Sequence, residues 1–92
     1  MTEEEARLKR LTMRSWRRGM KEMDLILGPF ADSEIKGLTP TDLDLYEALL
    51  EENDQDLYPW ITARLKGEHP GPAPFIPLLD RISTFAAARL RG

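Results

Sequence analysis

The stretch LTPTDLDLYEALLEEN, residues 38–53, carries the clearest structural signal in this 92-residue chain. Thr39 is a typical helix N-cap residue, Pro40 suits the first helical position, and Asp42 suits the positive end of a helix. The apolar residues that follow have helical spacing and predict one buried face, made of Leu43, Tyr46, Leu49 and Leu50. The sequence therefore predicts a helix that begins at Pro40.

Two further helices are predicted before this stretch. Residues 2–16 form the first, which Thr2 caps, with a sparse apolar face of Leu8, Leu11 and Trp16. The second begins near Gly19, and its apolar residues share one helical face: Met20, Met23, Leu27 and Phe30, with Ile26 beside them. Pro29 is expected to interrupt this helix because proline lacks an N–H donor, with a brief return to helix before Gly37.

Two more helices are predicted after it. A fourth helix begins at Asn53 or Asp54 and stops at Gly67, with Pro59 tolerated if it lies in the first turn. Its apolar positions are Leu57, Trp60, Ile61 and Leu65. Residues 66–74 form a proline-rich connector, and the apolar residues after it keep helical spacing: Phe75, Leu78, Leu79, Ile82, Phe85, Ala86 and Leu90.

These patterns predict an all-α fold, a bundle of about five short helices in one domain over residues 1–92. A chain of this length lacks room for both a core and an enclosed substrate cavity, which argues against an enzyme. It has no cysteine, no secretory signal and no apolar run near the roughly 20 residues that cross a bilayer. We therefore expect a cytoplasmic protein without membrane insertion.

The charges are divided along the chain, although 13 basic and 16 acidic residues nearly balance. From Arg7 to Lys21 there are seven basic residues and no acid, and from Asp32 to Asp56 there are nine acids and one base, Lys36. We expect this division to concern partners rather than the fold. The basic run could be a solvated face, a patch for an acidic protein, or a nucleic-acid-binding surface.

Residues that could carry chemistry are few. The single histidine, His69, lies in the connector without another histidine or a cysteine near it, so we predict no metal site. Asp54 and Asp56 are better explained by a helix N-terminus than by paired catalytic carboxylates. The chain has no dinucleotide or phosphate-binding fingerprint, so no stably bound cofactor is expected.

The stretch RRGMKEMD, Arg17 to Asp24, is less easily explained. A glycine inside a helix costs about 1 kcal/mol relative to alanine, so Gly19 needs a compensating reason. Either the backbone there adopts a conformation that requires glycine, or another surface approaches it closely. We expect Arg18 and Glu22 to be exposed, and the face that carries Met23 to be buried.

With RRGMKEMDLIL, the later PF and LYEALLEENDQDLYPWI, the chain resembles the SdhE family of succinate dehydrogenase flavinylation factors from about Arg14 to Ile61. The family hallmark is an arginine, a glycine and, three residues on, a glutamate. Here the hallmark is Arg18, Gly19 and Glu22. The resemblance implies that these residues bind the partner and that Arg17, Met23 and Asp24 line the same contact.

The resemblance also implies a function. The expected partner is the flavoprotein subunit of succinate dehydrogenase, with that of fumarate reductase as a second candidate. The chain would act as a monomeric assembly factor, not an enzyme, and would promote covalent attachment of FAD to a histidine of the subunit by stabilising a productive conformer. The alternative is a small helical nucleic-acid-binding or regulatory protein that uses the basic segment Arg7–Lys21.

Overall fold

A computed structural model describes the backbone of residues 1–91 and the side chains up to Arg89, so the predicted role of Leu90 lies outside the described residues. The elements are α1 (Glu3–Trp16), α2 (Lys21–Glu34), α3 (Pro40–Leu50), α4 (Asp54–Ala63) and α5 (Ile76–Arg91), with short 3-10 helices at Ile35–Gly37, Arg64–Lys66 and Ala73–Phe75. The described part of the chain contains no strand. The predicted all-α fold of five short helices is therefore confirmed.

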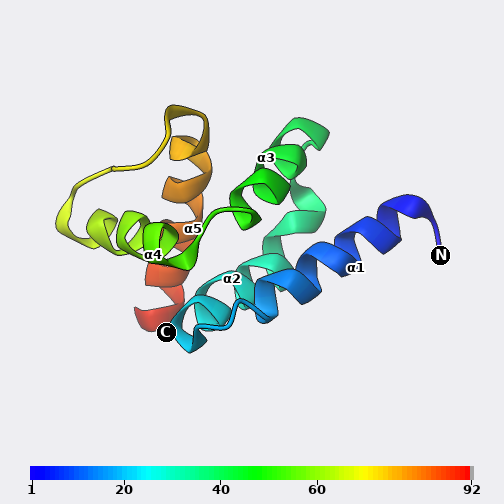
Figure 1. The fold of residues 1–92 in the computed structure, drawn as a ribbon, viewed down its shortest axis with the longest axis horizontal. Coiled ribbons are helices and arrows are strands. Elements are labelled where there is room, and N and C mark those ends of the chain that lie inside the picture. The colour runs from blue at the N-terminus through cyan, green and yellow to red at the C-terminus, as the bar shows by residue number, and fades with distance from the viewer. Residues whose placement is uncertain (92) are drawn as a thin grey trace.

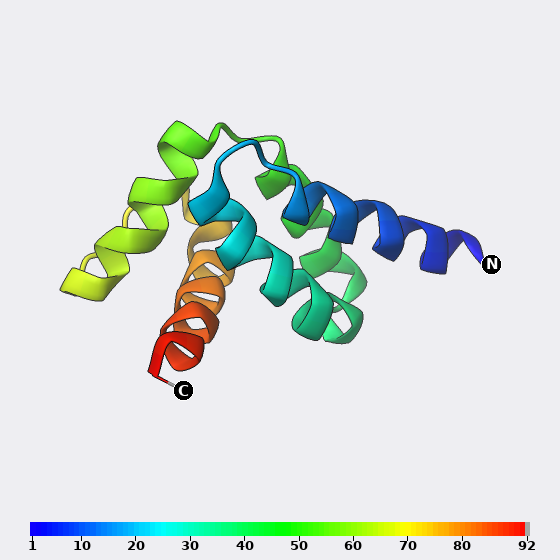
Figure 2. The ribbon, with the colours of Figure 1, turned by 90° about the horizontal axis from the view of Figure 1, so that it is seen from below.

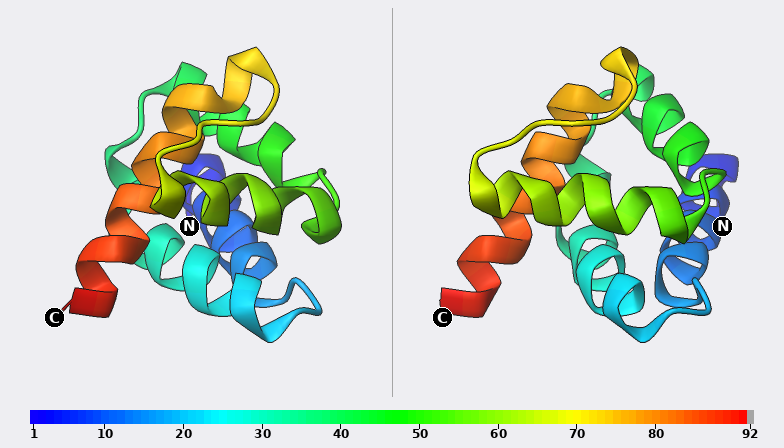
Figure 3. Two further views of the ribbon diagram at one scale, coloured as in Figure 1. Left: turned by 90° about the vertical axis from the view of Figure 1, so that its left-hand side faces the viewer. Right: turned by 60° about the vertical axis from the view of Figure 1, so that its left-hand side comes forward.

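The helices form a compact body from which the N-terminal half of α1 projects (Figures 1 and 2). α2 packs against α1 on one side and against α5 on the other, while α5 also contacts α3 and α4. Figure 3 shows α4 crossing α5, with the connector closing the corner between them. The α1–α2 turn lies near the start of α4 in Figure 2, which brings together two segments far apart in sequence.

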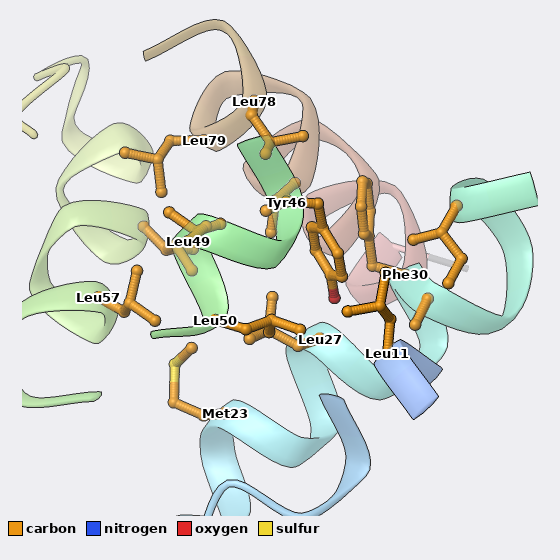
Figure 4. Packing of buried hydrophobic residues seen from close by; sticks show 14 of the residues in the cluster. Leu11, Met23, Leu27, Phe30, Tyr46, Leu49, Leu50, Leu57, Leu78 and Leu79 are labelled. Atoms are coloured by element: carbon orange, nitrogen blue, oxygen red, sulfur yellow. The ribbon is translucent and has the colours of Figure 1, made fainter. Parts of the chain in front are cut away.

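The core is built around two aromatic rings from α2 and α3 (Figure 4). The ring centroids of Phe30 and Tyr46 are 5.6 Å apart, and Phe85 meets Phe30 edge-on at 5.7 Å. The hydroxyl of Tyr46 lies 2.7 Å from the Ser15 hydroxyl, which donates to the Leu11 carbonyl. Burial raises the pKa of Tyr46 to about 12. The predicted buried face of α3 is confirmed in full.

The helix caps predicted at Thr2 and Thr39 are confirmed, and Asn53, predicted as one possible start of the fourth helix, caps α4. The Thr2 hydroxyl accepts from the Glu5 amide, the Thr39 hydroxyl from the Asp42 amide, and the Asn53 side chain from the Gln55 amide. Each cap supplies an acceptor to a helix N–H that has no partner within the helix. Local hydrogen bonds therefore set the first residue of each of these three helices.

The predicted interruption at Pro29 is wrong, because α2 continues through it to Glu34. Proline removes one hydrogen bond, and the carbonyl that loses its partner belongs to Leu25, on the exposed side of the helix. The Pro29 ring itself is buried. Tertiary packing of this segment therefore outweighs the local cost of proline.

Gly28 has a packing role in the same helix. A Cβ atom built there would lie 2.3 Å from the Trp16 ring, so only glycine lets α1 and α2 approach this closely. The Trp16 indole N–H also reaches the Asp32 carboxylate of α2, at 3.2 Å. Trp16 is thus a residue of the core edge that joins the first two helices.

Two predictions for α4 are corrected. Pro59 lies beyond the first turn, at the sixth helical residue, on the exposed side of the helix. Leu65 is 65% exposed and does not belong to the buried face, because the chain has already passed into the 3-10 helix Arg64–Lys66. The predicted stop at Gly67 is confirmed, since this glycine takes a left-handed φ of 82°.

Candidate partner-binding site

The loop between α1 and α2 runs from Arg17 to Met20 and turns at Gly19. Gly19 has a φ of +88°, a left-handed conformation that side-chain-bearing residues rarely adopt. No atom lies within 4 Å of a Cβ built at Gly19, so crowding is not the reason for glycine in the folded chain. The structure therefore supports the explanation that the backbone conformation requires glycine at this position. It also leaves open space next to the Gly19 backbone.

The Arg18 side chain is 10% exposed, so the prediction that it is exposed is wrong. Its Nε donates to Asp54 Oδ1 at 2.9 Å, and its Nη2 lies 2.8 Å from the same oxygen. The remaining donors reach the carbonyls of Leu50 and Glu52. The side chain turns inward because a buried guanidinium finds a carboxylate and two carbonyls there.

We call this set of contacts the Arg18 clasp, formed by Arg18 with Asp54 and the carbonyls of Leu50 and Glu52. It ties the α1–α2 loop to the end of α3 and to the first residue of α4. The Arg18 amide also donates to Asp24 Oδ1 at 2.7 Å, which fastens the loop to α2. The loop is therefore held from both sides.

The other predicted partner-binding residues differ in position. Arg17 and Glu22 are exposed, and Glu22 makes no ion pair with any described residue. Asp24 is half-buried, and Met23 is completely buried in the core. The structure thus leaves Arg17, Gly19 and Glu22 exposed, and it buries Met23 and most of the Arg18 side chain.

A shallow hollow of about 540 Å³ lies beside the loop. Its walls are the loop itself and the start of α4, namely Arg17, Arg18, Gly19, Met20, Glu52, Asn53, Asp54 and Gln55. Sequence reasoning explained Asp54 as a residue of a helix N-terminus, which it is, but missed its pairing with Arg18. The exposed side chains of Arg17, Asn53 and Gln55 give this hollow polar donors and acceptors.

The basic run of α1 contributes to the fold, which corrects the expectation that it concerns partners alone. Arg7 pairs with Asp44 and Glu47 of α3, at 2.6 and 2.8 Å. Hydrogen bonds that the Arg7 guanidinium donates to the Asp44 and Glu47 carboxylates raise the pKa of Arg7. Arg14 pairs with Glu51 at 2.7 Å. Three of the seven basic residues of the run, Arg7, Arg14 and Arg18, are therefore paired within the fold. This pairing reduces the free positive charge that a nucleic-acid-binding role would need.

A second arginine cluster, which sequence reasoning missed, lies at the far end of α4. Arg64 is 3% exposed, and its Nε donates to Asp80 Oδ1 at 2.6 Å. Its Nη1 donates to the carbonyls of Trp60 and Pro70. His69 lies on the surface, with Nδ1 2.8 Å from the same Asp80 oxygen. We call these contacts the Arg64 clasp.

Neither cluster has the composition of a metal site. Within the described residues, no group of three or more histidine, cysteine or acidic side chains could hold a metal ion. Across the same part of the chain, every helix is too short or too polar to span a bilayer. The described residues form a small helical protein whose α1–α2 loop is held in place by the Arg18 clasp.

Comparison with known proteins assigns this helical protein to a family. The family model described as "Flavinator of succinate dehydrogenase" matches residues 9–86. The chain therefore belongs to this family. No solved structure matches the chain.

Bacterial and fungal relatives agree with the assignment. The FAD assembly factor SdhE of Pseudomonas putida is 42% identical over 67 residues, which cover 73% of this chain and 79% of the relative. The mitochondrial succinate dehydrogenase assembly factor 2 of Candida glabrata is 44% identical over 57 residues, or 62% of this chain. The aligned region spans 37% of that fungal protein, so the two are similar over a shared domain.

Proposed function

We propose that this chain binds the flavoprotein subunit of succinate dehydrogenase and promotes covalent attachment of FAD to it. The observation that carries the proposal is the family match over residues 9–86, which includes the whole α1–α2 loop. The relatives are named for assembly of succinate dehydrogenase and for FAD assembly. The flavoprotein of fumarate reductase is a second candidate partner, and cytoplasmic location and a monomeric state stay predictions.

The proposed contact surface consists of Arg17, the backbone at Gly19, and Glu22. Arg18 acts indirectly, since its guanidinium is already bonded to Asp54 and to two carbonyls of this chain. It holds the loop in one conformation, so the partner meets a surface that does not need to be ordered on binding. Met23 supports this surface from the core, and Asp24 holds the loop through the Arg18 amide.

The role requires no catalytic group from this chain. The flavin methyl carbon and the histidine of the subunit must be held in line, and negative charge develops on the flavin as the bond forms. Groups of the subunit can supply this chemistry once their geometry is fixed. A helper that binds the productive conformer more tightly than the others increases its population by that difference in affinity. We therefore propose an assembly factor that is not an enzyme and holds no FAD stably.

The test is covalent flavin fluorescence of the flavoprotein subunit on a denaturing gel, produced with the wild-type chain, without it, and with Glu22→Ala. The matched control is Glu4→Ala, because Glu4 is an exposed glutamate at the second residue of α1, as Glu22 is in α2. Flavin is expected with the wild type and Glu4→Ala and is expected to fall in the other two samples. Equal flavin in all four samples would contradict the proposal.

A further inference from the structure

A groove lies beside Glu22, between α2, α4 and α5, and no residue of the α1–α2 loop lines it. Its volume is about 390 Å³, and its walls are Glu22, Leu25, Ile26, Tyr58, Ala86 and Arg89. Glu22, Leu25 and Ile26 share one face of α2 because they are three and four residues apart. The groove therefore begins at the glutamate proposed to meet the partner and continues along the same helix face.

The groove is mostly apolar although it is open to solvent. Leu25 is 56% exposed, while Ile26 and Tyr58 are half-buried and pack against the core. A single exposed leucine is ordinary. Here the exposed leucine lies in a hollow with a half-buried isoleucine and a tyrosine, so the three offer one concave apolar surface to a partner side chain. Covering a leucine side chain contributes to binding through the hydrophobic effect.

The lining of the groove includes one acid and one base from different helices. Glu22 lies on the α2 side, and Arg89 lies on the α5 side, where its guanidinium is 6.0 Å from the centre of the Phe85 ring. The exposed Arg89 side chain thus supplies its donors at the α5 edge of the groove, with one cation–π contact to Phe85. An apolar channel between one acid and one base selects a segment whose own charges are arranged in the complementary order.

We infer that this groove takes a large apolar side chain of the flavoprotein subunit, next to a basic residue of the same segment that pairs with Glu22. This inference rests on the proposed function and adds the chemistry of the segment that is recognised. Glu22 sets the register of the segment, the groove covers its apolar side chain, and Arg89 faces an acceptor on the far side. Leu25 is thereby a contact residue that the hallmark of arginine, glycine and glutamate does not include.

The test compares Leu25→Glu with Leu65→Glu, since Leu65 is a leucine of similar exposure that lies outside the groove. Affinity is measured by titration of the purified apo flavoprotein subunit, with circular dichroism to verify folding. Leu25→Glu should weaken binding at least about tenfold, and Leu65→Glu should bind as the wild type does. If Leu25→Glu does not fold, Leu25→Ala should still weaken binding severalfold.

A double-mutant cycle tests whether one segment contacts both positions. The double variant Leu25→Ala/Glu22→Ala should lose less affinity than the product of the two single losses. The reason is that either single change already weakens the contact between the groove and the same segment of the partner. Full additivity would contradict a shared segment. A wild-type chain that dimerises through Leu25 would show that a second copy fills the groove, which would also overturn the inference.

The outcomes separate this inference from the function on which it rests. Normal binding by a folded Leu25→Glu variant would overturn the groove inference alone, because the wild type would still bind and promote flavin attachment. Failure of the wild type to bind the subunit would overturn both.

Discussion

The two ends of α4 are held by arginines with the same set of partners, one carboxylate and two main-chain carbonyls, but in different surroundings. In the Arg18 clasp both charged side chains are nearly buried, with 10% of Arg18 and 12% of Asp54 exposed. In the Arg64 clasp the arginine is buried but its carboxylate, Asp80, is 42% exposed and shared with His69. The first clasp is thus a closed buried pair, whereas the second remains partly hydrated.

The two clasps differ in the segment that each of them holds in place. The Arg18 clasp lies directly below Gly19, a residue of the family hallmark, and fixes the loop that leads to Glu22. The Arg64 clasp fixes the connector against α5, at the opposite end of α4. The same device therefore serves a proposed recognition loop at one end and a structural connection at the other.

The largest expected effect is that of Arg18→Met. Removing the guanidinium leaves the Asp54 carboxylate buried without its partner, which should lower the free energy of unfolding by about 3–5 kcal/mol. Chemical denaturation measures the loss. The double variant Arg18→Met/Asp54→Leu should recover part of it, because it removes the unpaired charge. A loss no larger than that of an exposed pair would contradict the buried clasp.

Arg64→Met should lower the free energy of unfolding less than Arg18→Met does. Water can still reach Asp80, so the main loss is that of hydrogen bonds to the carbonyls of Trp60 and Pro70, about 1–3 kcal/mol. The same denaturation experiment gives the value. If Arg64→Met were as destabilising as Arg18→Met, the proposed difference between a closed and a hydrated clasp would be wrong.

Two glycines near the two ends of α4 allow a second comparison, with a smaller expected loss of stability. Gly19 and Gly67 both have a left-handed φ, of 88° and 82°, and neither has an atom within 4 Å of a built Cβ. Alanine at either position should destabilise the chain by about 1–2 kcal/mol through backbone strain alone. Their effects on binding should differ, since only Gly19 lies on the proposed contact surface.

Titration of the flavoprotein subunit with these two glycine variants gives the measurement. Gly19→Ala should bind much more weakly than Gly67→Ala at a temperature where both are folded. Gly19→Asn serves as a further control, because asparagine tolerates the left-handed conformation but still places a side chain on the surface. Equal affinities for Gly19→Ala and Gly67→Ala would contradict close approach of the partner at Gly19.

The smallest expected effect is a pH dependence of stability at the Arg64 clasp. Hydrogen bonds from His69 and then Arg64 lower the pKa of Asp80 in the folded state below its ordinary value of 3.8. A lowered folded-state pKa stabilises the protein above the unfolded-state value, and this contribution is lost as the pH falls through the folded-state value. The stability advantage of wild type over Asp80→Asn should therefore shrink below about pH 4. A constant difference across this range would contradict the coupling.

Local sequence was sufficient for most of the fold. The caps at Thr2, Thr39 and Asn53 act over two or three residues, and the buried face of α3 follows from helical spacing. The errors occur where distant packing decides the outcome. Pro29 lies within a continuous helix because its ring is buried in the core, which no local rule indicates.

The site was predictable in part. The resemblance selected Arg18, Gly19 and Glu22, but it did not indicate that Arg18 turns inward to Asp54, 36 residues away. One signal was available in the charge pattern, since Arg7 and Arg14 are seven residues apart, as are Asp44 and Glu51. Both arginines pair with these acids in the fold. Such matched spacing predicts that two helices align their charges, but the helix arrangement is needed to select the pairs.

Hydrogen–deuterium exchange of the chain, alone and bound to the flavoprotein subunit, tests most directly the claim that the partner meets the Arg18 end of α4. Binding should slow exchange in residues 17–26, which include the loop and the Glu22 face of α2, and should leave residues 64–70 unchanged. Protection at residues 64–70 with no change in residues 17–26 would contradict the account.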